Sequence, residues 1–275
     1  MNEIEEHLFL LSRDYYRYNL VDKYPVLEMA KSLLKLEKYN LDDEDYYSFD
    51  KTLYDIKNIL REININYFKQ IIRMITEDDT NKPIIYTYNS NNYIRNNSFI
   101  TGNEIHFYKT DTKFDKYYLL HEFSHYLINK SKFFNLNRPK NEIPPILMEF
   151  IISNIFDEKN AIKNRINNTV FESKSLIIKQ SIIDGNLDLE GLFELYDLTE
   201  EEKKFIKKDI LSKNYLNYKD EKKYIYGTLY GYYYSLNNDI DNYKNIVETM
   251  NNCEFRLPLV DTESLIYKLK KDYLI

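Results

Sequence analysis

The sequence predicts a mainly α-helical fold with a small antiparallel β-sheet, and three observations support this. Most of the 275-residue chain carries apolar residues at helical spacing between short polar turns. Two β-rich stretches, 84–88 and 98–108, are separated by an asparagine-rich loop, a pattern typical of an antiparallel pair. A long apolar helix is predicted to begin at about Lys113, directly after the second stretch. The sheet should therefore lie next to that helix.

The remaining elements follow in order along the chain. Before the sheet, helices are expected at 3–21, 25–39 and 42–76, and 77–83 is a cluster of turn residues. Pro144 and Pro145 suit the first turn of a helix that continues to Phe156. Thr199 and Glu202 form a capping box. Later helices are expected at 173–184, 188–196, 200–213, 218–237, 240–251 and 261–272. We expect an N-terminal helical part (1–80) and a second part (81–275), or one continuous domain.

The most informative motif is His121-Glu122-Phe123-Ser124-His125, an HExxH pattern within the apolar stretch YYLLHEFSHYLI. On a helix, histidines at i and i+4 lie on one face and can bind one zinc, with the glutamate directed at an activated water. The chain has four histidines, and two of them are in this pentapeptide. Glu122 is the only formal charge in that stretch. A buried carboxylate requires a cation or another polar partner.

A second isolated carboxylate, Glu149, is the expected third ligand. It is the sole charge in IPPILMEFIISNIF, and its distance from His125 leaves room for a loop and a returning helix. Three protein ligands would leave one position open, as in catalytic zinc sites. Glu142 and Glu158 are alternative ligands, but Glu142 precedes the prolines and Glu158 lies in a charged run. The sequence therefore predicts one zinc per chain.

These two motifs resemble the thimet oligopeptidase and oligoendopeptidase F family of zinc metallopeptidases. HEFSHYL followed by MEFIISNIFDE is similar to the family's zinc helix and to the helix that supplies its glutamate ligand. The spacing is equally compatible with angiotensin-converting-enzyme-like peptidases. The resemblance covers about residues 98–236 and implies a zincin-like, mainly α-helical metallopeptidase of the gluzincin type. Ser124 stands where the family usually has glycine, and this chain is shorter than most members.

The resemblance also implies that tyrosines stabilise the transition state. The segment YIYGTLYGYYYSL is similar to a tyrosine- and glycine-containing segment of the family, with Tyr226 at the best-matched position and Tyr224 and Tyr230 beside it. A phenol that remains protonated can donate a hydrogen bond to an oxyanion. The family's preceding histidine is missing here. The 28 tyrosines of this chain also permit a purely structural interpretation.

The expected mechanism uses zinc to activate a water, Glu122 as the general base and a tyrosine as the oxyanion donor. Either Ser153 or Asp157 could orient a ligand histidine. Residues 100–108 are the candidate edge strand that pairs with an extended substrate. We interpret His106 within it as an ordinary strand histidine.

Composition limits the remaining functional classes. The net charge of −6 disfavours nucleic acid as the main partner, and the single cysteine excludes an internal disulfide or a cysteine-rich zinc site. The N-terminus lacks a secretory signal and no apolar run reaches membrane-spanning length, so we expect a cytoplasmic protein without a membrane partner. A peptide substrate is expected. The sequence leaves the oligomeric state open, together with two alternatives: a regulatory protease that cleaves one protein partner, and a catalytically silent zinc-binding interaction protein.

Overall fold

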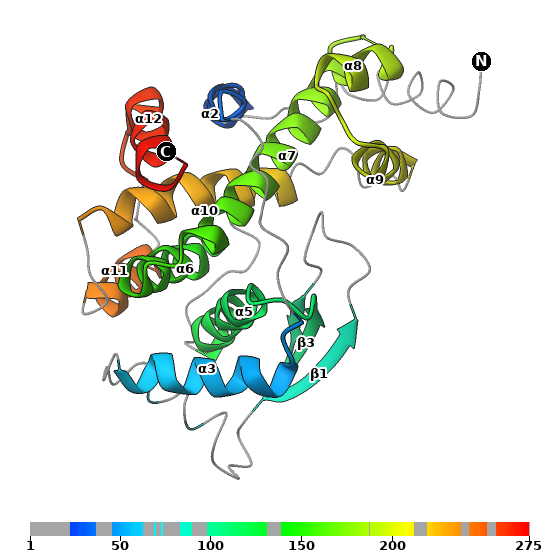
Figure 1. The fold of residues 1–275 in the computed structure, drawn as a ribbon. Helices are drawn as coiled ribbons and strands as arrows, with labels where there is room; N and C mark the ends of the chain where they lie inside the picture. The colour runs from blue at the N-terminus through cyan, green and yellow to red at the C-terminus, as the bar shows by residue number, and fades with distance from the viewer. Residues whose placement is uncertain are drawn as a thin grey trace.

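The computed structural model describes residues 23–36, 46–62, 69, 73, 83–89, 98–130, 139–186, 188–211, 219–237, 242–251 and 257–274. Within these residues the chain is mainly helical and contains a small three-stranded sheet (Figure 1), which confirms the predicted mainly α class. The helix predicted at 3–21 lies outside the described residues. No helix in the described part is long and apolar enough to cross a membrane.

Most helices lie close to their predicted positions. Among the described residues they are α2 (Lys23–Leu33), α3 (Phe49–Glu62), α5 (Asp115–Lys130), α6 (Ile143–Phe156), α7 (Lys159–Ile183), α8 (Leu189–Leu195), α9 (Glu200–Leu211), α10 (Lys219–Ser235), α11 (Tyr243–Asn251) and α12 (Thr262–Tyr273). A short 3-10 helix, η2 (Pro139–Glu142), leads directly into α6. The main difference is α7, a single helix of 25 residues of which only the last part was expected. The predicted capping box of α9 is confirmed by hydrogen bonds in both directions between Thr199 and Glu202.

The sheet is mixed, which corrects the expected antiparallel pair. Its strands are β1 (Ile84–Asn89), β2 (Phe99–Thr101) and β3 (Glu104–Lys109), in the spatial order β1-β3-β2. A turn with Gly102 at a φ of 60° folds the second β-rich stretch into a β2–β3 hairpin, and β1 pairs with β3 in parallel. Because β3 is the central strand, it has β1 on one side and β2 on the other. The prediction that residues 100–108 form an edge strand available to pair with a substrate is therefore wrong for β3, which has no free edge in the described sheet.

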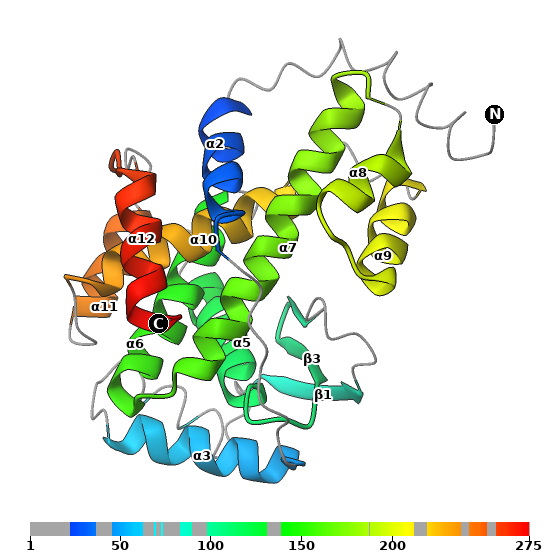
Figure 2. The same cartoon turned by 45° about the horizontal axis from the view of Figure 1, so that its top comes forward.

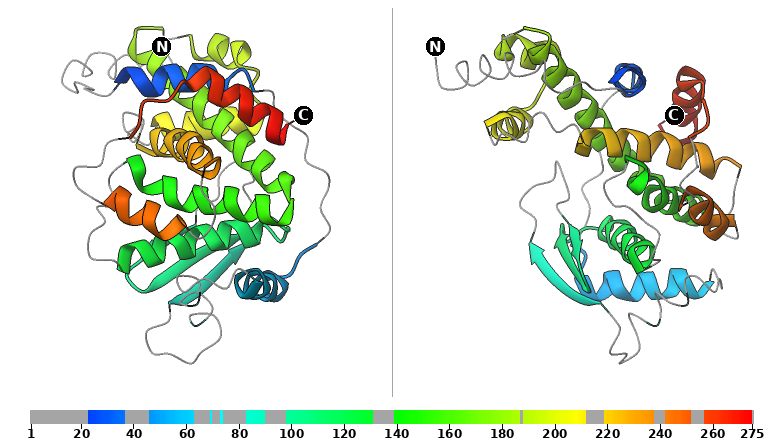
Figure 3. Two further views of the ribbon diagram at one scale, coloured as in Figure 1. Left: turned by 90° about the vertical axis from the view of Figure 1, so that its left-hand side faces the viewer. Right: turned by 180° about the vertical axis from the view of Figure 1, so that it is seen from behind.

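The helices are stacked in successive layers on one face of the sheet. Ile105 and Phe107 of β3 are fully buried in the core shared with α5. Next to α5 lies α6, and α10 crosses α6 on the side away from α5 (Figures 1 and 3). The C-terminal part of α7 packs with α8 and α9 in a separate cluster (Figure 2). The helix α6 therefore lies between the HExxH helix and α10.

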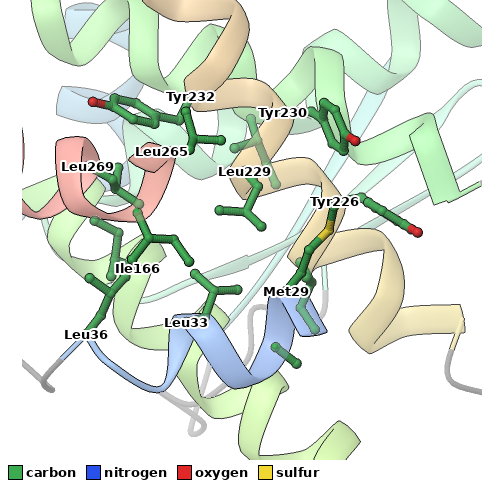
Figure 4. Close-up of a cluster of buried hydrophobic side chains, with 14 of the residues drawn as sticks. Met29, Leu33, Leu36, Ile166, Tyr226, Leu229, Tyr230, Tyr232, Leu265 and Leu269 are labelled. Carbon is green, nitrogen blue, oxygen red and sulfur yellow. The ribbon is translucent and has the colours of Figure 1, made fainter. Parts of the chain in front are cut away.

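The position of α6 explains its nearly all-apolar sequence. Ile146 and Phe150 belong to a core shared with α2, α7, α10 and α12, part of which is drawn in Figure 4. Leu147 and Ile151 belong to the core shared with α3, α5 and the sheet. A helix buried on opposite faces cannot be amphipathic, so its few polar side chains must find partners inside the protein.

Candidate metal centre

The two histidines of the HExxH motif lie on one face of α5, as predicted. Asp115, the first residue of α5, accepts hydrogen bonds from the backbone N–H groups of Thr110 and Asp111, which fixes the start of the helix. The rings of His121 and His125 are 4.8 Å apart between centroids and are nearly perpendicular. Their Nε2 atoms are 3.1 Å apart, so both rings present the same nitrogen to one point.

Glu142 completes this group. Its Oε2 atom is 3.0 Å from His121 Nε2 and 3.3 Å from His125 Nε2. With zinc–ligand bonds of about 2.0–2.1 Å, two ligands of a tetrahedral site are about 3.3 Å apart. The three atoms form a triangle of that size and are suited to hold a metal ion. The 3-10 helix η2 carries Glu142 to this position at the start of α6.

The expected third ligand, Glu149, lies behind His121 instead. Its Oε1 atom is 2.6 Å from Nδ1 of His121, the ring nitrogen opposite the one that faces His125 and Glu142. An imidazole that binds a metal through one nitrogen can donate a hydrogen bond from the other, and this bond fixes its orientation. Glu142 therefore lies with the two histidines where a metal ion could be held, whereas Glu149 contacts the opposite nitrogen of His121.

The partner of Glu149 is Arg165 of α7, which the sequence analysis did not single out. Its Nε and Nη2 atoms donate to the two carboxylate oxygens at 2.9 and 2.6 Å, a bidentate pair in which both side chains are buried. Burial raises the pKa of Glu149, but Arg165 and His121 outweigh this and lower it below its usual value. Glu149, the only charged residue of α6, therefore remains ionised, and Arg165 balances its charge.

Glu122 is buried beside the cluster, with 7% of its surface exposed. Burial raises the pKa of its carboxyl group, while the nearby His125, His121 and Lys223 counteract the increase. A carboxyl group with a raised pKa is suited to accept and return a proton near neutral pH. This placement agrees with the role expected from the motif.

Opposing effects act on the other two charged members of the cluster. Burial raises the pKa of Glu142, but His125, His121 and Lys223 outweigh it and hold the pKa well below its ordinary value. Burial lowers the pKa of His121, but its hydrogen bonds to Glu142 and Glu149 raise it to about 9. Glu142 is therefore held in its ionised form, in which its carboxylate can serve as a ligand of a cation.

Ser124, which stands where the resembled family has glycine, has a structural role. Its Oγ atom is 2.6 Å from the hydroxyl of Tyr243 on α11, and that hydroxyl donates to the Pro144 carbonyl at 3.0 Å. The single phenolic proton goes to Pro144, so Ser124 must be the donor to Tyr243. This chain of hydrogen bonds joins α5 to the first turn of α6, two residues after Glu142.

The three candidate tyrosines have different described contacts. Tyr230 donates its hydroxyl to the Pro258 carbonyl at 3.0 Å, and Tyr226 packs in the core cluster that also contains Met29 (Figure 4). That cluster contains no residue of α5. Tyr224 adjoins the partner of Glu149, because the guanidinium of Arg165 lies 5.8 Å from its ring centroid. The role of Tyr226 as oxyanion donor stays a prediction.

The other candidates stabilise the corner between α6 and α7. Ser153 donates to the Glu158 carbonyl, and the N–H of Asp157, a residue with a φ of 53°, donates to the Ser153 carbonyl. The Glu158 side chain accepts from Lys116 and Tyr117. Asp157, Glu158 and Tyr117 also line a surface hollow of about 650 Å³. Of Glu149, Ser153 and Asp157, it is Glu149 for which the structure describes a contact with His121.

His106 is confirmed as a strand histidine that participates in an aromatic cluster. It lies on the outer face of the sheet, where its ring stacks on Phe99 and Tyr86. Its nitrogens are 3.1 Å from the Tyr88 hydroxyl and from a Glu104 oxygen.

Two further polar groups at the centre were missed by the sequence analysis. Lys223 Nζ is 3.3 Å from Glu142 Oε1. Asn141, next to Glu142, is buried, and neither polar atom of its side chain has a hydrogen-bond partner in the described structure. A buried amide of this kind calls for a water or ligand atom as its partner. The sequence offered one signal for each residue: Asn141 precedes the alternative ligand Glu142, and Lys223 precedes the candidate Tyr224.

Comparisons of the chain with models of protein families, with curated proteins and with solved structures give no match. The assignment of a function therefore depends on the geometry of the site.

Proposed function

We propose that the protein is a zinc-dependent metallopeptidase in which His121, His125 and Glu142 hold the metal and Glu122 is the general base. The observation that carries the proposal is the triangle of two Nε2 atoms and one carboxylate oxygen, with sides of 3.0–3.3 Å, beside a buried glutamate of the HExxH motif. Two histidines and one glutamate are a ligand set of catalytic zinc sites, which keep one position open.

The residues of the chain would divide the work as follows. Bound zinc would supply Lewis acidity and lower the pKa of a water at its open position. Glu122 would accept the proton of the attacking water and deliver it to the leaving amine nitrogen. Glu149, held by Arg165, would keep the Nδ1 proton of His121 in place, so that Nε2 remains available as a ligand. The burial of the centre would limit access of bulk water.

The resemblance to the thimet oligopeptidase and oligoendopeptidase F family supports the same reaction. The HExxH helix, the buried second helix and the closely packed α10 occur in the expected order. We therefore also propose a zincin-like fold, membership of this family and a peptide substrate.

The proposal is tested by incubating the zinc-loaded protein with a mixture of peptides, with and without a chelator, and comparing Glu122→Gln. We expect cleavage that the chelator abolishes, and at least about a hundredfold slower cleavage by the variant, because the amide cannot accept the proton of the water. Glu158→Gln is a matched control, since Glu158 lies at the α6–α7 corner. Cleavage of one sequence only would indicate a regulatory protease. Absence of cleavage by the zinc-loaded protein would contradict the proposal and favour a catalytically silent binding protein.

A further inference from the structure

Lys223 of α10 contacts the carboxylate oxygen of Glu142 that does not face the two histidines. Its Nζ atom is 3.3 Å from Oε1 of Glu142, whereas the histidines lie next to Oε2. The side chain of Lys223 is 30% exposed, compared with 6% for Glu142 and 14% for His125. Lys223 is therefore more exposed to solvent than the carboxylate and the histidine that it adjoins.

Lys223 forms an ion pair with Glu142 at the proposed centre, and its Nζ atom also lies 5.1 Å from the ring centroid of Tyr224. The other cation nearby, Arg165, is buried and forms a bidentate pair with Glu149. Lys223 is the more exposed of the two cations.

We propose that Lys223 is a catalytic residue whose ammonium group stabilises the oxyanion formed during peptide hydrolysis, an inference that rests on the proposed function. When the water oxygen bonds to the substrate carbonyl carbon, the π electron pair of the carbonyl moves to its oxygen. Glu122 takes the water proton and passes it to the amine nitrogen as the C–N bond breaks. Negative charge therefore develops on the substrate oxygen at the centre, where a positive group stabilises the transition state more than the ground state.

The chemistry of lysine suits this role. Its ammonium is a compact charge on a flexible stem, so it can move from Glu142 Oε1 to a substrate oxygen without rearrangement of α10. The tyrosines of the same segment have other described contacts: Tyr230 with Pro258, Tyr226 within the core, and Tyr224 with Arg165. The neighbouring Lys222 lies 5.9 Å above the ring of Tyr226. Lys223 is therefore a residue of this segment whose side chain forms a described ion pair with Glu142.

The kinetic test compares Lys223→Met with Lys222→Met, which removes the same charge one residue away. We expect Lys223→Met to lower kcat by about ten- to a thousandfold with KM changed less than about threefold, because the interaction forms mainly in the transition state. Lys222→Met should retain kcat within about twofold, and Lys223→Arg should recover part of the loss. Zinc affinity is measured for each variant.

A binding measurement makes the test independent of turnover. The probe is a peptide phosphonate, in which a tetrahedral anionic phosphorus group replaces the scissile carbonyl, titrated into the zinc-loaded protein by calorimetry. We expect Lys223→Met to weaken its binding at least about tenfold and Lys222→Met to leave it unchanged, because such analogues resemble the transition state.

Three results would overturn the inference. They are an unchanged kcat in Lys223→Met, equal phosphonate affinity in both variants, and loss of zinc together with activity, which would mean that Lys223 only holds Glu142. If the wild-type protein cleaves no peptide, the proposed function fails, and the phosphonate titration still decides whether Lys223 binds an anion at the centre.

Discussion

Both ring nitrogens of His121 contact a glutamate, Nε2 with Glu142 and Nδ1 with Glu149, so the two glutamates have different roles in the proposed centre. Nε2 faces Glu142 and His125, while Nδ1 faces the Glu149–Arg165 pair. The assignment leads to a measurable contrast. Loss of a direct ligand should weaken zinc binding more than loss of a group that only orients a ligand.

We expect Glu142→Gln to lower zinc affinity more than about a hundredfold, and Glu149→Gln to lower it about ten- to a hundredfold, the usual effect of an outer carboxylate. Both affinities are measured by competition with a chromophoric chelator on folded protein. Glu149→Gln should also reduce stability, because it leaves the buried Arg165 without its charged partner, a loss of about 3–5 kcal/mol for buried pairs. A larger loss of zinc affinity in Glu149→Gln than in Glu142→Gln would make Glu149 the ligand.

For single residues, the sequence indicated which side chains take part in the centre more reliably than which residues they contact. The isolated charge of Glu149 was interpreted as a zinc ligand, whereas in the structure this buried carboxylate pairs with Arg165. The cation, Arg165, comes from α7, whose first half the apolar pattern did not predict. Glu142 was an alternative ligand ranked below Glu149 because it precedes Pro144 and Pro145, yet η2 brings it to the two histidines. Local sequence cannot show which way such a turn directs a side chain.

At the scale of elements, the close approach of α10 to α6 places Glu142. A Cβ atom at Gly227 would lie 2.6 Å from Ile146 Cδ1 and 2.9 Å from Glu142 Cβ, and one at Gly231 would lie 3.1 Å from Leu147 N. Both glycines therefore let α10 approach α6 closely. Of the two, only Gly227 contacts Glu142.

The two glycines therefore form a matched pair. Gly227→Ala and Gly231→Ala should each destabilise the fold by about 1–3 kcal/mol, because overpacking forces the helices apart. We expect only Gly227→Ala to weaken zinc binding markedly as well, since it displaces the backbone of Glu142. Urea unfolding and chelator competition measure the two effects. Equal zinc affinity in both variants would show that the position of Glu142 does not depend on this contact.

Helices were predictable where the apolar pattern agreed with residues that favour the start of a helix. Pro144 and Pro145 start α6, and the capping box of Thr199 and Glu202 starts α9. The sheet was predictable only in part. Gly102 splits one β-rich stretch into a hairpin, and the pairing of β1 with β3 depends on tertiary packing that no local pattern encodes.

At the scale of the whole molecule, stability depends on a second buried charged group far along α7. Lys179 is 2% exposed and pairs with Asp209 of α9 and Glu221 of α10. Burial lowers the pKa of Lys179, but Glu221 and Asp209 outweigh it and raise the pKa above its ordinary value of 10.5. This group connects three helices.

Because the pKa of Lys179 is higher in the folded than in the unfolded chain, its contribution to stability is complete below pH 10.5 and is lost as pH rises through the folded value. We expect the difference in unfolding free energy between wild type and Lys179→Met to be smaller at about pH 11.5 than at about pH 9. Urea unfolding at both values measures it. A difference that does not change with pH would contradict this assignment.

The central claim is that His121, His125 and Glu142 hold one zinc ion. The most direct measurement is an anomalous difference map, recorded at the zinc absorption edge, from crystals of the zinc-loaded protein. The account predicts one peak per chain, about 2.0–2.2 Å from His121 Nε2, His125 Nε2 and a Glu142 oxygen. Glu149 should remain on Nδ1 of His121. A peak coordinated by Glu149 in place of Glu142, or no peak between the two histidines, would contradict it.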